Sequence, residues 1–163
     1  MEMKQGNFNT DSQIEYKFSK VIKGILGNYF INKDITQDLK QGTDFSVFTV
    51  TPFRVAVRLR RFDQYIKPGY KDEFTIRYSR PSGVKTEYQK INEGLVDYIL
   101  YGFIDKEERK IIQYFIGDLR IFRTMKLKPL AIKPNNPHDS DLAIYKINQY
   151  PKTFILHFYT ANG

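Results

Sequence analysis

The nine residues from Phe53 to Arg61 constrain the fold more than any other segment, because their side chains alternate in character. One face of an extended chain here carries Val55, Val57 and Leu59. The other face carries Arg54, Ala56, Arg58 and Arg60. This period of two predicts a β-strand with an apolar face in the core. Two interpretations of the arginine face stay open: a polar surface in solvent, or the floor of a phosphate-binding cleft.

An amphipathic helix is predicted ahead of this strand. Its apolar stripe recurs at helical spacing and consists of Ile14, Phe18, Val21, Ile22, Ile25, Tyr29 and Phe30. Ser12 with Glu15 matches a capping box at the helix start, and Thr10 with Gln13 offers a second start. The polar residues 32–43 are predicted to form a loop that leads into a strand over Asp44–Val50.

The remainder of the chain reads as alternating short elements. The predicted strands are Phe74–Tyr78, Leu95–Ile104, Ile111–Ile116, Leu142–Ile147 and Phe154–Tyr159, the last two forming a terminal pair. A turn at Arg80–Gly83 and a short helix over 85–93, ended by Gly94, separate the first two of these strands. Asp118 is predicted to cap a second amphipathic helix with Leu119, Phe122 and Met125 on its core face. This order predicts an α/β (α+β) fold with a mixed central sheet flanked by helices. It fits a single domain over residues 1–163, with an ordered core of about 12–159.

Composition narrows the classes of function. The chain has no cysteine and only two histidines, His138 and His157, which excludes disulfides and thiolate catalysis and argues against a histidine metal site. His157 alternates with apolar residues and is expected to be structural. No apolar run approaches the roughly 18–20 residues of a membrane span, so no membrane partner and a cytoplasmic location, bacterial or in a host cell, are expected.

Positive charge is concentrated in one part of the chain. The net charge is +8, and residues 54–90 hold ten Lys and Arg against four Asp and Glu. Such an excess is typical of proteins that contact nucleic-acid phosphates. The predicted contacts are Arg54, Arg58, Arg60, Arg61, Arg77, Arg80 and Lys85. Interleaved tyrosines either stack on bases or pack within the fold: Tyr65, Tyr70, Tyr78 and Tyr88.

Several short motifs resemble the PD-(D/E)XK, or restriction-endonuclease-like, nuclease superfamily, especially its small phage-type members. Glu15 lies on the first helix, and Gly42-Thr43-Asp44-Phe45 resembles the Gly-x-Asp sequence at the start of a strand. Residues 74–105 resemble the later part of such nucleases: a strand, a Ser-Gly turn, and a strand with the pair Asp97-Tyr98. The resemblance runs in order from residue 12 to residue 158, through the helix that begins at Asp118-Leu119-Arg120.

The resemblance implies a metal-dependent DNA endonuclease, a hydrolase in which two carboxylates hold Mg²⁺ or Mn²⁺ to activate water. Asp44 stands at the place of the first metal ligand, and Glu15 would assist it. Ala56 stands at the place of the second acid, and Arg58 stands at the place of the lysine. An arginine stabilises the charge of a phosphate, but it keeps its proton at neutral pH and so cannot serve as a base. Other carboxylates that would restore the second ligand are Asp38, Asp63 and Glu73, each with a surface role as its alternative.

Two functions therefore follow from the sequence. The first is a nucleic-acid-binding protein that either cuts its ligand with an altered site or has lost catalysis, and DNA is the expected ligand in preference to RNA. The second is a non-catalytic interaction or scaffold protein, for instance a viral one, that retains the nuclease fold. The resemblance also implies a homodimer. Asp97, inside the apolar strand predicted over Leu95–Ile104, is expected to take a hydrogen-bonded structural role rather than a catalytic one.

Overall fold

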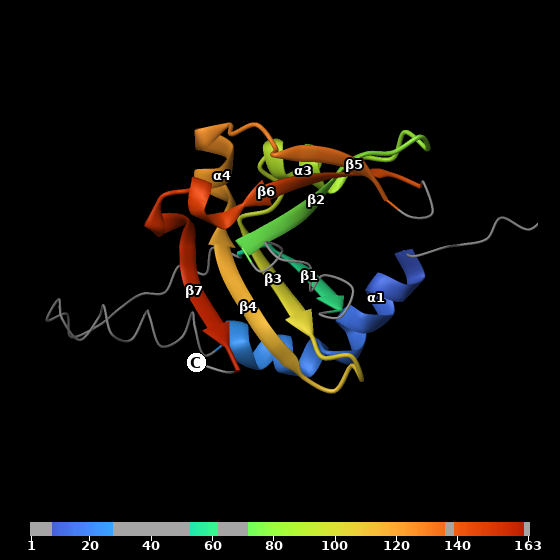
Figure 1. The fold of residues 1–163 in the computed structure, drawn as a ribbon, viewed down its shortest axis with the longest axis vertical. Helices are drawn as coiled ribbons and strands as arrows, with labels where there is room; N and C mark the ends of the chain where they lie inside the picture. The colour runs from blue at the N-terminus through green and yellow to red at the C-terminus, as the bar shows by residue number, and fades with distance from the viewer. Residues whose placement is uncertain (1–7, 28–52, 62–71, 136–138, 162–163) are drawn as a thin grey trace, which may run out of the picture.

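The computed structural model describes residues 8–27, 53–61, 72–135 and 139–161, and these form two sheets with a few helices (Figure 1). A four-stranded mixed sheet has the order β1-β3-β4-β7. Its strands are Val55–Arg61, Tyr98–Ile104, Ile111–Asp118 and Ile155–Thr160. A three-stranded antiparallel sheet has the order β2-β6-β5, with strands Glu73–Ser79, Asp141–Lys146 and Ala131–Pro134. The mixed α/β character predicted from the sequence is confirmed.

Helices lie on both sides of the four-stranded sheet. The α-helices are α1 (Phe8–Lys17), α3 (Glu87–Asn92) and α4 (Leu119–Met125), and residues 19–27 are also helical. Two short 3₁₀ turns, Ile147–Gln149 and Lys152–Phe154, connect β6 to β7. No helix within the described ranges is long and apolar enough to span a membrane.

Two apolar cores lie on opposite faces of the four-stranded sheet. One core packs the helical segment at 14–22 against the sheet through Ile14, Phe18, Ile22, Leu59, Leu100, Ile104, Ile111 and Tyr114. The other core lies between the two sheets, α3 and α4, with the Phe74 ring in contact with the rings of Tyr101, Phe115, Phe122, Tyr145, Tyr150 and Phe154. Figure 1 shows this layering, with α1 and the three-stranded sheet on opposite sides of the four-stranded sheet.

The alternation of β1 is confirmed, and it determines which side chains face each of the two cores. Leu59, with Val55 and Val57, packs on the α1 side. Ala56 packs against the core between the sheets, and Arg58 and Arg60 on this same face are only 9% and 8% exposed. The arginine face is therefore neither an open surface nor an ordinary core.

Four further sequence predictions are confirmed. The turn at Arg80–Gly83 is present, with Gly83 at φ 72°, a conformation that glycine adopts without strain. The short helix α3 is followed by Gly94, also at φ 72°. The strand predicted over Leu95–Ile104 is present as β3 (Tyr98–Ile104), and all seven of its residues are buried. The Asp118 side chain caps α4 by accepting a hydrogen bond from the Arg120 N–H.

Three predictions are wrong: the pairing of the last two strands, the start of the first helix and the burial of Met125. β6 and β7 do not pair: β6 lies between β2 and β5, while β7 pairs with β4 in the other sheet. The helix begins at Phe8 rather than at Ser12 or Thr10, so Glu15 lies inside it and not in a capping box. Met125 is 42% exposed because it is the last residue of α4, beyond the reach of the core.

The predicted central sheet flanked by helices holds only in part. One face of the four-stranded sheet meets a helix, but the other face meets a second sheet as well as α3 and α4. The loop over 32–43 and the strand over Asp44–Val50 lie outside the described residues.

Candidate functional site

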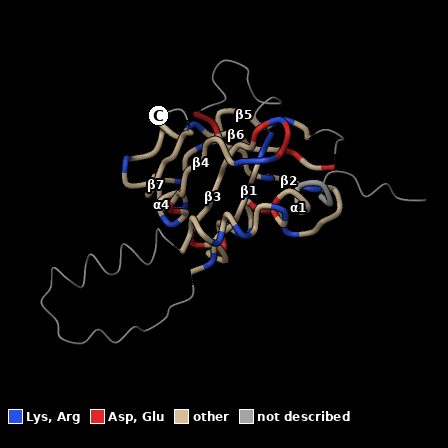
Figure 2. The backbone as a smooth tube through the Cα atoms, turned by 90° about the horizontal axis from the view of Figure 1, so that it is seen from below, with Lys and Arg blue, Asp and Glu red and all other residues tan. Residues whose placement is uncertain are grey.

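A hollow of about 310 Å³ opens where β1, β2 and the start of α3 meet. Its lining consists of Ala56, Arg58, Arg77, Arg80, Val84, Lys85, Thr86, Glu87, Lys90 and Val96. Five of these ten residues carry a positive charge and one carries a negative charge, so we call it the basic hollow. Figure 2 marks the basic positions of β1 and β2 in blue.

The floor of the basic hollow is made by two buried arginines. Arg58 of β1 is 9% exposed and Arg77 of β2 is 5% exposed. A guanidinium cannot lose its proton at neutral pH, so both charges persist in this poorly solvated place. Charges that are removed from water interact more strongly with an incoming ion than the same charges at the surface do.

One carboxylate, Glu87, organises the floor. Its Oε2 accepts a hydrogen bond from Arg58 Nη2 at 2.6 Å, and its Oε1 accepts one from Arg58 Nε at 3.3 Å. The same Oε2 accepts the backbone N–H of Arg77 at 3.1 Å. Glu87 therefore connects both sheets to the first turn of α3.

The rim of the basic hollow carries three more cations. Lys85 and Lys90 are exposed and Arg80 is half-buried. Lys85 Nζ lies 2.7 Å from Oε2 of Glu93, in an ion pair whose side chains are 58% and 42% exposed. An exposed pair of this kind contributes little to stability and can exchange its partner for another anion.

The start of α3 is fixed by Thr86, which is buried. Its hydroxyl accepts the Gln89 N–H at 3.3 Å, and the Gln89 side chain accepts the Thr86 N–H at 2.8 Å, which completes a capping box. The same hydroxyl donates to the Tyr78 carbonyl at 3.1 Å and so ties the helix start to β2. This local order places Glu87 opposite Arg58.

The positive field of the basic hollow extends to Asp139. Burial disfavours the ionised form of this carboxyl, but hydrogen bonds from Ser140 and Asn135 and the charges of Arg77 and Arg80 hold its pKa below the ordinary value. Asp139 is therefore an anion near the two arginines.

Four of the seven predicted nucleic-acid contacts line the basic hollow: Arg58, Arg77, Arg80 and Lys85. The other three do not line it. Arg54 binds Asp97 through its backbone N–H and its guanidinium, at 3.0–3.2 Å, and these hydrogen bonds hold the pKa of Asp97 below its usual value. The predicted hydrogen-bonding of Asp97 is confirmed.

Arg61 and Arg60 also lie away from the basic hollow. Arg61 points to the α1 side, where its Nε donates to Glu108 Oε1 at 2.6 Å, and Lys17 Nζ lies 3.6 Å from the other oxygen of that carboxylate. Arg60 is buried on the inter-sheet face of β1, two residues beyond Arg58.

The structure does not bring together Arg58 and Glu15, the two predicted catalytic residues that lie within the described ranges. Arg58 faces the inter-sheet core, whereas Glu15 belongs to α1 on the opposite face of the four-stranded sheet. Asp44, Asp38 and Asp63 lie outside the described residues, and Glu73 stands at the far end of β2 from Ser79, opposite Lys146.

The described part of the basic hollow does not suit a divalent cation. Its one carboxylate is already bonded to Arg58, and five cations surround it. Nowhere in the described ranges do three His, Asp or Glu side chains gather into a group able to hold a metal ion. The ligand that this donor set fits is an anion.

The tyrosines near the basic hollow pack against each other. The rings of Tyr78 and Tyr88 lie 4.7 Å apart, between β2 and α3, which supports the packing interpretation for this pair. Tyr65 and Tyr70 lie outside the described residues, as does His138. His157 is exposed, with its Nε2 3.3 Å from the Tyr114 hydroxyl.

No protein-family model matches the chain, and no match was found among the curated proteins or the solved structures.

Proposed function

We propose that the chain binds nucleic acid through the basic hollow, and that this hollow holds the phosphate backbone. The observation that carries the proposal is the placement of five cations around one cavity, where the one acid among the described lining residues is already bonded to Arg58. Arginine presents a planar set of donors that matches two phosphate oxygens, and lysine adds an adaptable charge. Arg77 in the floor contacts a phosphate, and the rim cations follow the nucleic-acid strand on either side of it.

The resemblance to the PD-(D/E)XK superfamily favours DNA over RNA as the ligand. Within that superfamily, the chain would be a catalytically altered derivative. Ala56 occupies the position of the second acid and packs against the inter-sheet core. Arg58, at the lysine position, forms an ion pair with Glu87. Both features support binding without cleavage.

A second candidate is an interaction or scaffold protein that keeps this fold and binds no nucleic acid. The Arg58–Glu87 pair favours it, because the charge of Arg58 is neutralised from within the fold. The two candidates differ in one measurable property. Binding to phosphates releases counterions from the nucleic acid and is weakened steeply by salt.

Fluorescence anisotropy of labelled single-stranded and duplex DNA, titrated at several salt concentrations, tests the proposal. If the four hollow cations other than Arg58 each meet a phosphate, the logarithm of the affinity for single strands falls with a slope of about −3 in the logarithm of salt. Absence of binding, or binding that salt does not change, contradicts the proposal and favours the scaffold.

Cleavage of supercoiled DNA with Mg²⁺ or Mn²⁺ separates a binding derivative from an active endonuclease. We expect salt-sensitive binding without cleavage. Cleavage that disappears in Asp44→Asn would instead establish the metal-dependent nuclease, with Asp44 as a ligand.

A further inference from the structure

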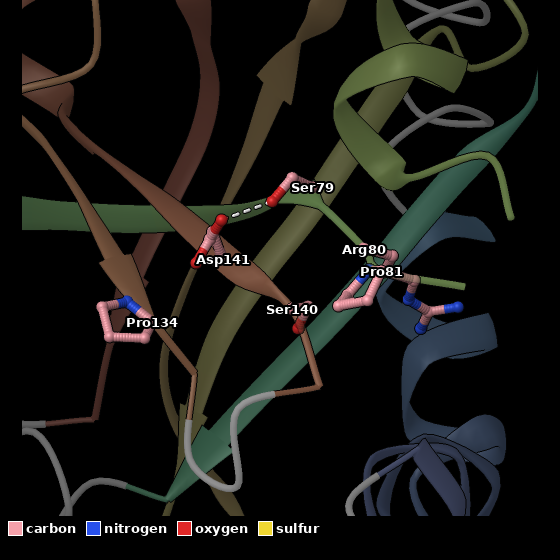
Figure 3. A pocket seen from close by; sticks show the side chains of 6 residues that line it. All are labelled: Ser79, Arg80, Pro81, Pro134, Ser140 and Asp141. Atoms are coloured by element: carbon pink, nitrogen blue, oxygen red, sulfur yellow. Dashed lines mark hydrogen bonds between the residues drawn. The ribbon is translucent and has the colours of Figure 1, made fainter. Parts of the chain in front are cut away.

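A second hollow of about 300 Å³ adjoins the basic hollow, and Arg80 lines both. It lies where the end of β2, the end of β5 and the start of β6 come together, and we call it the side hollow. Its lining consists of Ser79, Arg80, Pro81, Pro134, Ser140 and Asp141. Figure 3 shows Pro134 on one side and Arg80 with Pro81 on the other, with Asp141 and Ser140 between them.

We propose that the side hollow binds an unpaired nucleobase whose edge presents hydrogen-bond donors, which among the common bases is guanine. The inference rests on the proposed function, because the base would arrive on the strand whose phosphate the basic hollow holds.

The acceptor is the carboxylate of Asp141. The Ser79 hydroxyl donates a hydrogen bond to its Oδ2, shown by the dashed line in Figure 3, and so fixes its orientation. Its Oδ1 receives no hydrogen bond from any described residue. An ionised carboxylate only accepts hydrogen bonds, so it selects a ligand that offers donors.

The bases differ in what they offer to such an acceptor. Guanine presents N1–H and its 2-amino group side by side, which matches one carboxylate with two hydrogen bonds. Adenine and cytosine each place a ring acceptor beside their amino group. Thymine places carbonyl oxygens on both sides of its N–H. These acceptors repel the carboxylate, so guanine is favoured.

The walls of the side hollow suit a flat ring. Pro81 and Pro134 are exposed apolar rings, and bases removed from the stack commonly lie against apolar or aromatic side chains. A volume near 300 Å³ is at the small end of the range for ligand pockets, which fits a single heterocycle.

The two hollows are chemically distinct, and this difference favours a base over a second phosphate. The acid of the basic hollow is bonded to a cation, whereas Asp141 is bonded to a hydroxyl, with the ionised Asp139 nearby in sequence. A phosphate would be repelled by these carboxylates. Because a base is joined to its phosphate by one sugar, a phosphate beside Arg80 brings a base to the side hollow.

The test uses short thymine oligonucleotides that carry one central guanine, hypoxanthine, adenine or cytosine, with affinities measured by anisotropy on the full chain. Wild type should bind the guanine oligonucleotide about tenfold more tightly than the adenine one, the discrimination expected of a two-point base contact. Hypoxanthine lacks the 2-amino group and should fall between them.

Variants test whether the preference for guanine depends on Asp141. Asp141→Asn should abolish the preference for guanine while the affinity for the plain thymine strand and its salt dependence persist. Asp72→Asn is the matched control, because it removes the same charge from an exposed residue just ahead of β2, outside the side hollow. It should keep the preference. Ser79→Ala retains the carboxylate and should weaken the preference only in part.

The outcomes separate this inference from the proposed function. Equal affinity of wild type for all four oligonucleotides, with steep salt dependence, overturns the base site and leaves the phosphate site standing. A guanine preference that survives in a folded Asp141→Asn also overturns it. If Asp141→Asn does not fold, the comparison of guanine with hypoxanthine on wild type decides. No binding of any oligonucleotide overturns both.

Discussion

Arg58 of β1 and Glu87 of α3 form a two-point ion pair, with Nη2 to Oε2 at 2.6 Å and Nε to Oε1 at 3.3 Å. The backbone N–H of Arg77 binds the same carboxylate at 3.1 Å. The side chains of the pair are only 11% and 16% exposed, so water competes little for these hydrogen bonds. One acid thus fixes the position of both floor arginines of the basic hollow.

Glu87→Gln is expected to lower the free energy of unfolding by about 2 kcal/mol, because it removes the charge of Glu87 from beside a poorly solvated Arg58. Urea unfolding followed by circular dichroism measures the change, since the chain has no tryptophan. Glu93→Gln is the control: its ion pair with Lys85 is exposed, and its loss should change stability by at most about 0.5 kcal/mol. Equal effects of the two variants would show that the Arg58 pair is not special.

Arg80→Ala and Lys85→Ala should each weaken DNA binding. Each should also make the slope of log affinity against log salt shallower by about one, the effect of losing one phosphate contact. Both residues line the basic hollow, and neither belongs to its buried floor, so the fold should tolerate the changes. Arg109→Ala removes the same charge from a side chain that is 74% exposed in the β3–β4 turn. This control should bind like wild type. A loss as large as that of Arg80→Ala would mean that binding follows net charge rather than the hollow.

Most helices and strands of this fold could be predicted, because hydrophobic periodicity depends only on residues close together in the sequence. The partners of the strands could not. β6 and β7 both alternate and follow each other, yet the 3₁₀ turns at Ile147–Gln149 and Lys152–Phe154 carry the chain from one sheet to the other. β5 was missed because its four residues include Lys133 and Pro134, which are unfavourable in strands.

The sequence predicts which basic residues belong to the site, but not which carboxylates pair with them. Arg77 and Arg80 were identified from the basic excess alone, whereas Glu87 is 29 residues from the arginine that it binds. The Thr86–Gln89 capping box was the available signal, because it fixes the first turn of α3 and so the position of Glu87. Arg61 was predicted to meet a phosphate, but its partner Glu108 lies 47 residues away.

Gly102→Ala should destabilise the protein by about 1–3 kcal/mol. A Cβ at this position of β3 would lie 2.9 Å from the Gln113 carbonyl oxygen and 3.0 Å from the Tyr114 Cβ, and neither can move without disturbing β4. Gly24→Ala is the opposite case, because its Cβ would meet nothing within 4 Å in a helical segment. That variant should gain up to about 1 kcal/mol. Thermal melts of both variants give the comparison, and a Gly102→Ala variant as stable as wild type would show that the packing of β3 on β4 tolerates a Cβ at this position.

Asp118→Asn should remove a part of the stability that depends on pH. Burial alone would raise the pKa of Asp118, but hydrogen bonds from the Arg120 side chain and backbone, at 2.6–3.2 Å, lower it below its ordinary value. A carboxyl whose folded pKa is depressed stabilises the fold above its unfolded pKa of about 4, and this contribution is lost as the pH falls through the folded pKa.

Asparagine caps a helix as well as aspartate does, so the variant isolates the charge from the cap. At pH 7 the variant should be less stable by about 1 kcal/mol, the usual worth of a charge-assisted hydrogen bond over a neutral one. The difference should shrink as the pH falls below the unfolded pKa and through the lowered folded pKa of Asp118, because wild type then loses the same charge. Urea unfolding at several pH values measures both. A difference that stays constant down to the lowest pH would assign the effect to shape rather than to the ionised carboxylate.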